Sequence, residues 1–353
     1  MTPYIILFLF LISIILVLLE QYFEKYKTII YLFLGFILII TAGLREVGVD
    51  PDSINYEQSF INYDKADMSD NIELSYIYLS TFVHLFSNDV HFLFLIFAFI
   101  GVSIKMLAFK RMSELIFLPM MVYISYYFTA HECMQIRTGV LSGIYLLIVK
   151  MLADNEKKKA LFLLMIGVFF HVSALLILPF FLLSNKKITF RMKIFWASLI
   201  PLAYAFALAG FSILFNVLDL PIIGNKLELY QKANEIGKSV GYINIFAPRD
   251  ILSIFIFYYL LFFHDTICQR NIYFPLMIKI LAIGLFMYVA FSFFPVLAQR
   301  TYMLYNTVSI LLISNIYYTI RPKWASIIVV AFISFIYLNY SLAFYEFYLI
   351  WKV

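Results

Sequence analysis

The sequence is poor in charge and in cysteine. Charged residues make up 13% of its 353 residues, and its polar stretches are too short to fold as a separate soluble domain. The two cysteines, Cys133 and Cys268, are expected at opposite faces of a membrane, so they cannot pair, and no metal-ligand spacing surrounds either. We therefore predict one integral-membrane domain over residues 1–353, without a disulfide.

Several catalytic motifs are also missing. The sequence contains no nucleotide-binding loop, no Ser-His-Asp order, no zinc spacing and no paired-carboxylate motif. We therefore predict that no metal and no cofactor takes part. The net charge of +5 does not indicate nucleic-acid binding, since the basic residues cluster in short loops.

Hydrophobic residues are abundant instead. They make up 64% of the chain, and the mean hydropathy is +0.92. Such values are typical of an all-α polytopic membrane protein, here with about 10–12 transmembrane helices. The apolar runs that predict these helices lie at about 3–19, 28–44, 90–109, 115–130, 136–153, 194–218, 250–264, 274–297, 302–319 and 324–346.

Two further segments are less regular. Residues 72–88 are only weakly apolar, and we place them on the outer face without a crossing. Residues 160–183 are interrupted in the middle by Phe170-His171-Val172-Ser173 and are predicted to form a re-entrant hairpin of two half-helices. With these choices most basic loop residues become cytoplasmic, as the positive-inside rule requires; they are Lys25, Lys27, Lys110, Arg111, Lys157, Lys158, Lys159, Lys186, Lys187, Arg191, Lys193, Arg270, Arg321 and Lys323.

Two long loops, about 45–71 and 219–249, then face outward. Loops of this length in a helix bundle are often lids or binding loops. Both carry tyrosines that could stack on sugar rings, although an interfacial aromatic belt also explains them. These are Tyr56, Tyr63, Tyr230 and Tyr242.

Four arginines map to the outer third of the predicted bundle: Arg45, Arg137, Arg249 and Arg300. An arginine inside the membrane costs at least about 2.5 kcal/mol on insertion scales. Guanidinium groups bind phosphates in a bidentate geometry. We predict a shared anion site, with snorkelling to lipid headgroups as the alternative.

Several residues are candidates for a general base. His171, at the apex of the predicted hairpin, is the first candidate because its pKa lies near neutrality. A buried histidine bonded to a backbone carbonyl is the structural alternative. The other candidates are Asp50, which could instead form a turn with Pro51, and the pair His131 and Glu132.

Several short motifs resemble those of the EpsG family of polysaccharide-biosynthesis membrane proteins. They occur in the family's order between about residues 40 and 320, although Thr138 stands where the family usually has Gln. The matching stretches are Arg45-x-x-Gly48-x-Asp50 with Tyr56, Phe60 and Glu73; Ile136-Arg137-Thr138-Gly139; Phe170-His171-Val172-Ser173-Ala174; and Arg300 with Tyr302.

The resemblance implies a Wzy-type polymerase of O-antigen, capsule or exopolysaccharide with a GT-C-like architecture. Such an enzyme joins undecaprenyl-diphosphate-linked repeat units at the outer face of the bacterial inner membrane, next to a flippase and a chain-length regulator. Arg45, Arg137, Arg300 and Arg249 would then bind the diphosphate, and Tyr56 and Tyr302 the sugars. His171 or Asp50 would be the base, and Arg45 and Arg137 would stabilise the leaving diphosphate.

Other classes of membrane protein would also need cations for a diphosphate. The alternatives are a lipid-linked oligosaccharide flippase, an O-antigen ligase and an O-acetyltransferase. A flippase would need polar residues through both halves of the membrane, whereas the intramembrane charges here lie mostly towards one face. This asymmetry favours the polymerase.

Overall fold

The computed structural model describes residues 2–50, 52–63, 73–208, 243–343 and 345. Every regular element in this part of the chain is a helix. Five of the helices are long and apolar enough to cross a membrane: Thr2–Leu19, Val90–Met112, Ile136–Ala153, Phe190–Leu208 and Lys323–Ala343. The prediction of an all-α polytopic membrane protein is confirmed.

The chain divides into two compact units, which are described separately. The first unit comprises Met1–Lys186, Asp265–Met277 and Thr307–Val353. Its helices are α1 (Thr2–Leu19), α2 (Lys27–Gly43), α3 (Ser53–Ile61), α4 (Leu74–His84), α5 (Val90–Met112), α6 (Phe117–Val122), η2 (Tyr123–Met134), α7 (Ile136–Ala153), α8 (Lys157–Phe170), η3 (Val172–Leu182), α13 (His264–Cys268, which starts one residue earlier), α16 (Ser309–Ser314), η5 (Asn315–Tyr318) and α17 (Lys323–Ala343).

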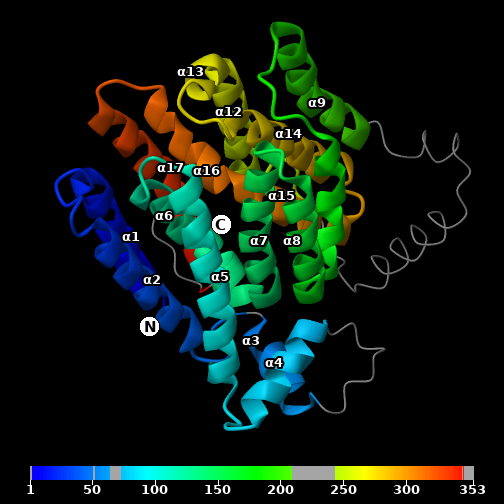
Figure 1. Cartoon of the computed structure of the whole chain (residues 1–353). Coiled ribbons are helices and arrows are strands. Elements are labelled where there is room, and N and C mark those ends of the chain that lie inside the picture. Colours follow the sequence, from blue (N-terminus) through cyan, green and yellow to red (C-terminus); the bar gives the residue numbers. More distant parts are fainter. Residues whose placement is uncertain (1, 51, 64–72, 209–242, 344, 346–353) are drawn as a thin grey trace, which may run out of the picture. The chain divides into compact units, whose positions relative to one another are not determined.

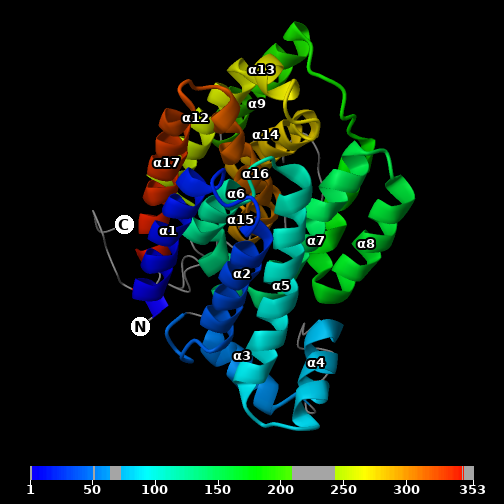
Figure 2. The same cartoon turned by 60° about the vertical axis from the view of Figure 1, so that its left-hand side comes forward.

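Helix α5 is central to the first unit. It packs against α2 and α7, and α7 packs in turn against α8 (Figure 1). Asp89 caps its start by accepting a hydrogen bond from the His91 backbone N–H, and Lys110 and Arg111 lie in its last turn. An N-terminal cap and C-terminal cations both stabilise a helix. The short helices α3 and α4 lie near the start of α5 (Figure 2).

The segment before α7 changes its helical pitch. The predicted run 115–130 begins as α6 and continues as a π-helix, η2, to Met134. The α-helical α7 starts after Gln135, so Arg137 is its second residue. π-Helical segments are rare in proteins, and those that occur are often found at functional sites.

The chain reverses its direction at His171. That residue has an extended backbone between α8 and the 3-10 helix η3. After η3, Asn185 donates a hydrogen bond to the Ala153 carbonyl, so both ends of the segment return to the end of α7. The two helical segments of the predicted hairpin and the reversal between them are therefore present. The re-entrant position of this hairpin in a membrane stays a prediction.

The second unit comprises Lys187–His264 and Ile278–Asn306. It contains α9 (Phe190–Leu208), α12 (Pro248–Phe262), most of α14 (Phe274–Ala290), α15 (Pro295–Tyr305) and the start of the 3-10 helix η4 (Asn306–Val308). Tyr258 on α12 donates a hydrogen bond to the Ala197 carbonyl on α9.

Two predicted helices in the last third of the chain have different bounds. The run 274–297 ends as a helix at Ala290, and a new helix starts at Pro295. Proline is favoured in the first turn of a helix because it has no N–H to satisfy there. The run 302–319 was predicted as one helix, but it is divided among α15, η4, α16 and η5.

Candidate functional site

The loop after α2 folds around a buried ion pair. The Arg45 Nε donates to the Asp50 carboxylate at 3.0 Å, and both side chains are fully enclosed. The Arg45 Nη1 donates to the Ala42 carbonyl, and its guanidinium lies 4.1 Å from the ring centre of Phe94. Burying an ion pair is tolerated only with such additional partners.

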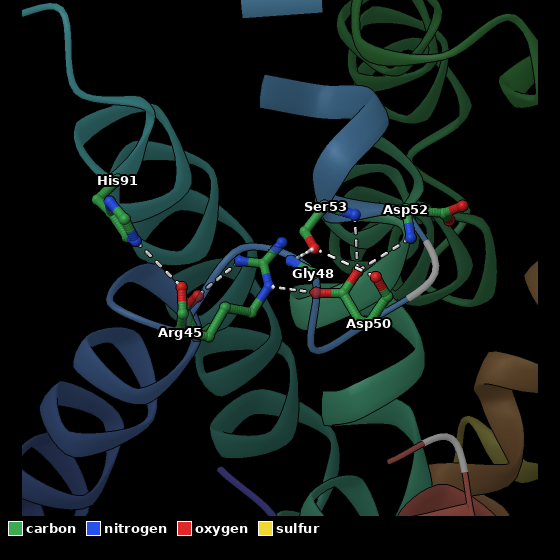
Figure 3. Close-up of polar contacts among 7 residues, drawn as sticks. Arg45, Gly48, Asp50, Asp52, Ser53 and His91 are labelled. Atoms are coloured by element: carbon green, nitrogen blue, oxygen red, sulfur yellow. Dashed lines mark hydrogen bonds and ion pairs between the residues drawn. The ribbon is translucent and has the colours of Figure 1, made fainter. Parts of the chain in front are cut away.

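Asp50 also organises the start of α3. Its other carboxylate oxygen accepts hydrogen bonds from the backbone N–H groups of Asp52 and Ser53 (Figure 3). The Gly48 N–H donates to the Ser53 hydroxyl, and Gly48 has a φ of 92°. Glycine adopts such a backbone without steric cost. Arg45, Gly48 and Asp50 therefore form a hydrogen-bonded turn. Pro51, the partner in the turn predicted as the alternative role of Asp50, lies outside the described residues.

A second group of charges lies at the start of α7. Arg137 forms an ion pair with Glu73, the residue before α4. The other carboxylate oxygen of Glu73 lies 3.2 Å from the His171 Nε2 at the α8–η3 reversal. About a quarter of the Arg137 side chain stays exposed, at 23%. Unlike Arg45, Arg137 is therefore accessible to a ligand.

The hydrogen bonds of His171 indicate its tautomer. Its Nδ1 accepts a hydrogen bond from the Ser173 backbone N–H at 3.0 Å. A neutral imidazole that accepts at Nδ1 carries its proton at Nε2, which faces Glu73. In this state His171 acts as a donor that orients Glu73, and its predicted role as base stays a prediction.

Aromatic rings connect the two groups. The guanidinium of Arg137 lies 5.7 Å from the ring centre of Tyr56 and 5.8 Å from that of Tyr76. Tyr56 also contacts Phe94 edge to face, at 6.4 Å, and Phe94 is the ring beside Arg45. Tyr56 also stacks on Tyr76. It thus stands between the surroundings of the two arginines, and its predicted contact with a sugar stays a prediction.

The carboxyl group of Asp52 is affected by the same charges. Its side chain points away from Asp50 (Figure 3). Burial raises the pKa of Asp52 above its usual value, the nearby Asp50 raises it further, and Arg137 and Arg45 lower it in part. Burial also raises the pKa of Tyr56, against the effect of Arg137. Asp52 is thus a titratable group close to both arginines.

A polar network inside the first unit joins α5, η2 and the start of α7, the helix that carries Arg137. The buried Lys105 of α5 forms an ion pair with Glu132 of η2 and donates to the Gly139 carbonyl of α7. Tyr123 donates to Glu132, and the His131 Nδ1 lies 3.1 Å from the Ser142 hydroxyl. His131 and Glu132, predicted as an alternative base pair, are both fully buried.

The remaining predicted residues belong to the second unit. Arg249 forms an ion pair with the neighbouring Asp250 at 3.1 Å and lies 6.0 Å from the ring centre of Tyr302. The Tyr302 ring stacks on Tyr288, which donates to Asp250. Arg300, on α15, is exposed at the surface of the unit.

The structure therefore groups the predicted residues by unit. Arg45, Asp50, Tyr56, Arg137 and His171 lie together in the first unit, while Arg249 and Tyr302 are neighbours in the second. Tyr230 and Tyr242, and most of the predicted loop 219–249, lie outside the described residues. Sequence reasoning noticed Glu73 as part of a motif but assigned it no role, although it joins Arg137 to His171.

The profile of one protein family matches almost the whole chain. It is that of the EpsG family, and it covers residues 28–351. The chain belongs to the EpsG family. This is a bacterial family of Wzy-like polymerases, so membership indicates a polysaccharide polymerase-type role in a membrane.

The sequence-based identification of the EpsG family is confirmed. Neither a curated protein nor a solved structure matches the chain. The GT-C-like architecture implied by the family resemblance therefore stays a prediction. The first-unit group, with Arg137 partly accessible beside the stacked rings of Tyr56 and Tyr76, is the candidate site of this EpsG-family chain.

Proposed function

We propose that this chain polymerises lipid-linked oligosaccharides. A growing polymer on one undecaprenyl diphosphate is the donor, and a single repeat unit on another is the acceptor. The reaction takes place at the outer face of the bacterial inner membrane, where the donor is already activated by its diphosphate. The products are O-antigen or a related surface polysaccharide.

The observation that carries this proposal is the environment of Arg137. Its guanidinium is partly exposed at the start of an apolar helix and stands beside the rings of Tyr56 and Tyr76. A permanent, partly exposed guanidinium suits a diphosphate, because arginine binds phosphate oxygens in a bidentate geometry. Family membership independently supports a polymerase.

In the proposed reaction Arg137 stabilises the diphosphate as it leaves. Negative charge develops on the leaving oxygen, and a fixed cation near it in a site with little water lowers the barrier by several kcal/mol. Arg45 contributes indirectly, since its charge is paired with Asp50 and the pair holds the turn before α3, the helix that carries Tyr56. Arg249, Arg300 and Tyr302 belong to the second unit, and their predicted contacts with diphosphate and sugar stay predictions.

Deletion of the gene tests this proposal. We expect the lipopolysaccharide or capsule of the deletion strain, separated on a gel, to carry one repeat unit in place of the ladder. The wild-type gene should restore the ladder.

The rival functions give other patterns. Loss of a flippase or a ligase leaves no repeat unit on the core, and loss of an acyltransferase leaves a normal ladder. Either of these patterns would contradict the proposed polymerase.

A further inference from the structure

Glu73 differs from Asp50, the carboxylate that pairs with Arg45. Asp50 is fully enclosed and also accepts two backbone hydrogen bonds, so it is a fixed part of its turn. Glu73 directly precedes α4, yet its side chain does not cap that helix. Among the described residues its carboxylate is held by two side chains from other elements, Arg137 and His171.

The carboxylate of Glu73 therefore occupies a place that an anionic ligand would need. Its side chain is 15% exposed and that of Arg137 is 23% exposed, so the pair lies at the rim of the folded unit. The Arg137 Nε is buried without a hydrogen-bond partner among the described residues. Carboxylate and phosphate oxygens bind a guanidinium in the same way, and an entering diphosphate competes directly with Glu73.

The neighbours of Glu73 suit a proton acceptor. His171 presents its Nε2 proton to one oxygen of Glu73, while the backbone N–H of Ser173 holds the opposite side of the imidazole ring. A side chain oriented by a second group that is itself fixed is the usual arrangement of a general base. Here the carboxylate is the acceptor, and the histidine is the orienting group.

We propose that Glu73 pairs with Arg137 in the empty protein, is displaced by the donor diphosphate, and then serves as the proton acceptor of the glycosyl transfer. This inference rests on the proposed polymerase function. The acceptor hydroxyl oxygen forms a bond with the anomeric carbon, and the bond from that carbon to the diphosphate oxygen breaks. The electron pair of the broken bond leaves with the diphosphate at Arg137, and the hydroxyl proton moves to the Glu73 carboxylate and then to water.

The two roles of Glu73 predict opposite effects of one substitution. In Glu73→Gln the competing charge is lost, so Arg137 is available more often to a ligand. If Glu73 occupies Arg137 for about nine-tenths of the time, apparent affinity rises about tenfold in the variant. Removing a general base lowers the turnover by about 10²- to 10⁴-fold.

The experiment uses the full chain in lipid nanodiscs. Binding is measured with sugar-free undecaprenyl diphosphate, and turnover with undecaprenyl-diphosphate-linked repeat units. The matched control is Glu46→Gln, which removes an exposed carboxylate from the loop after α2 and should leave both quantities within about twofold of wild type. Glu73→Asp keeps the charge with a shorter reach and should give an intermediate turnover.

Tighter binding with slower turnover in Glu73→Gln supports the proposal. Equal losses of binding and turnover indicate a scaffold role and overturn it. Turnover close to wild type overturns the role of proton acceptor, and weaker or unchanged binding overturns the displacement. If the wild-type chain forms no polymer at all, the proposed function itself fails, which distinguishes the two failures.

Discussion

At the scale of single residues, the four arginines that look equivalent in the sequence have different surroundings. Arg45 is enclosed with Asp50, Arg137 is partly accessible, Arg249 pairs with its neighbour Asp250, and Arg300 is exposed. Hydropathy and spacing predict that all four lie at a similar depth in the membrane. They could not predict burial, because burial depends on contacts such as that between Arg45 and Phe94, which are far apart in sequence.

Substitutions of His171 can distinguish a role as hydrogen-bond donor to Glu73 from a role as general base. In His171→Gln the side-chain amide can donate to Glu73 as Nε2–H does, but it is not a base at neutral pH. We expect His171→Gln to keep a larger share of the polymerase turnover than His171→Phe, which has no donor. The measurement is polymer formation by each purified variant. Equal inactivation of both would support the role of base predicted from the sequence.

Asp52 provides a pH-dependent prediction. Burial raises its pKa in the folded chain above the reference value of 3.8, so the fold favours its neutral form. The resulting stability is present below the unfolded pKa and is lost as the pH rises through the folded pKa. Asp52→Asn should therefore unfold at a higher temperature than wild type near pH 8, with a smaller difference near pH 4. A larger advantage at the acidic pH would contradict the raised pKa.

At the scale of elements, the sequence predicted most helices but not their interruptions. The apolar runs predicted α1, α2, α5, α7 and α17 closely, because each is continuous and bounded by polar residues. The break before Pro295 was missed, since hydropathy continues through it. From the sequence, the segment 72–88 is only weakly apolar, and its helix was not predicted. It contains α4, whose 11 residues extend about 17 Å at 1.5 Å per residue, too little to cross a layer of about 30 Å.

The contacts of Glu73 could not be predicted either. It approaches Arg137 and His171 only because α4 packs against α5 and α8. The motif that contains Glu73 was visible in the sequence, but a tertiary contact of this kind has no local signal. By contrast, the chain reversal at His171 did have one, a polar interruption in the middle of an apolar segment.

The contact of η2 with α5 includes a buried ion pair. Lys105 and Glu132 have 0% and 1% of their side chains exposed. Removing one partner of such a pair leaves an unpaired buried charge and costs about 3–5 kcal/mol. We expect Lys105→Met alone to be strongly destabilising and Lys105→Met/Glu132→Gln to be less so.

Thermal unfolding of the single and double variants in detergent measures this coupling through a double-mutant cycle. A double variant less stable than the Lys105→Met single variant would contradict the proposed pairing. Lys150→Met serves as the control, because its ion pair with Asp154 is about 20% exposed at the lysine and should contribute at most about 1 kcal/mol.

At the scale of the whole molecule, the proposed polymerase must have one orientation in the membrane. The loop that carries Asn62 must face outward, and the lysines at both ends of the 160–183 hairpin must face the cytoplasm. Asn62, Lys158 and Lys186 are all exposed, and the two native cysteines are buried. Cysteine labelling can therefore test the orientation with little background.

The labelling experiment uses three variants, Asn62→Cys, Lys158→Cys and Lys186→Cys. An impermeant maleimide should label the first in intact spheroplasts and the other two only after the membrane is permeabilised, as the positive-inside rule requires. Labelling of Lys158→Cys and Lys186→Cys from opposite sides would show that the hairpin crosses the membrane.

The central claim is that Arg137 binds the diphosphate of a polymerised donor. Lysine keeps the charge of arginine but lacks its planar, bidentate group. The most direct test compares wild type, Arg137→Lys and the control Arg111→Lys, at the far end of α5, for polymer formed from undecaprenyl-diphosphate-linked repeat units in nanodiscs. We predict a ladder for wild type and Arg111→Lys and a loss of at least about 100-fold for Arg137→Lys. A full ladder from Arg137→Lys would contradict the claim.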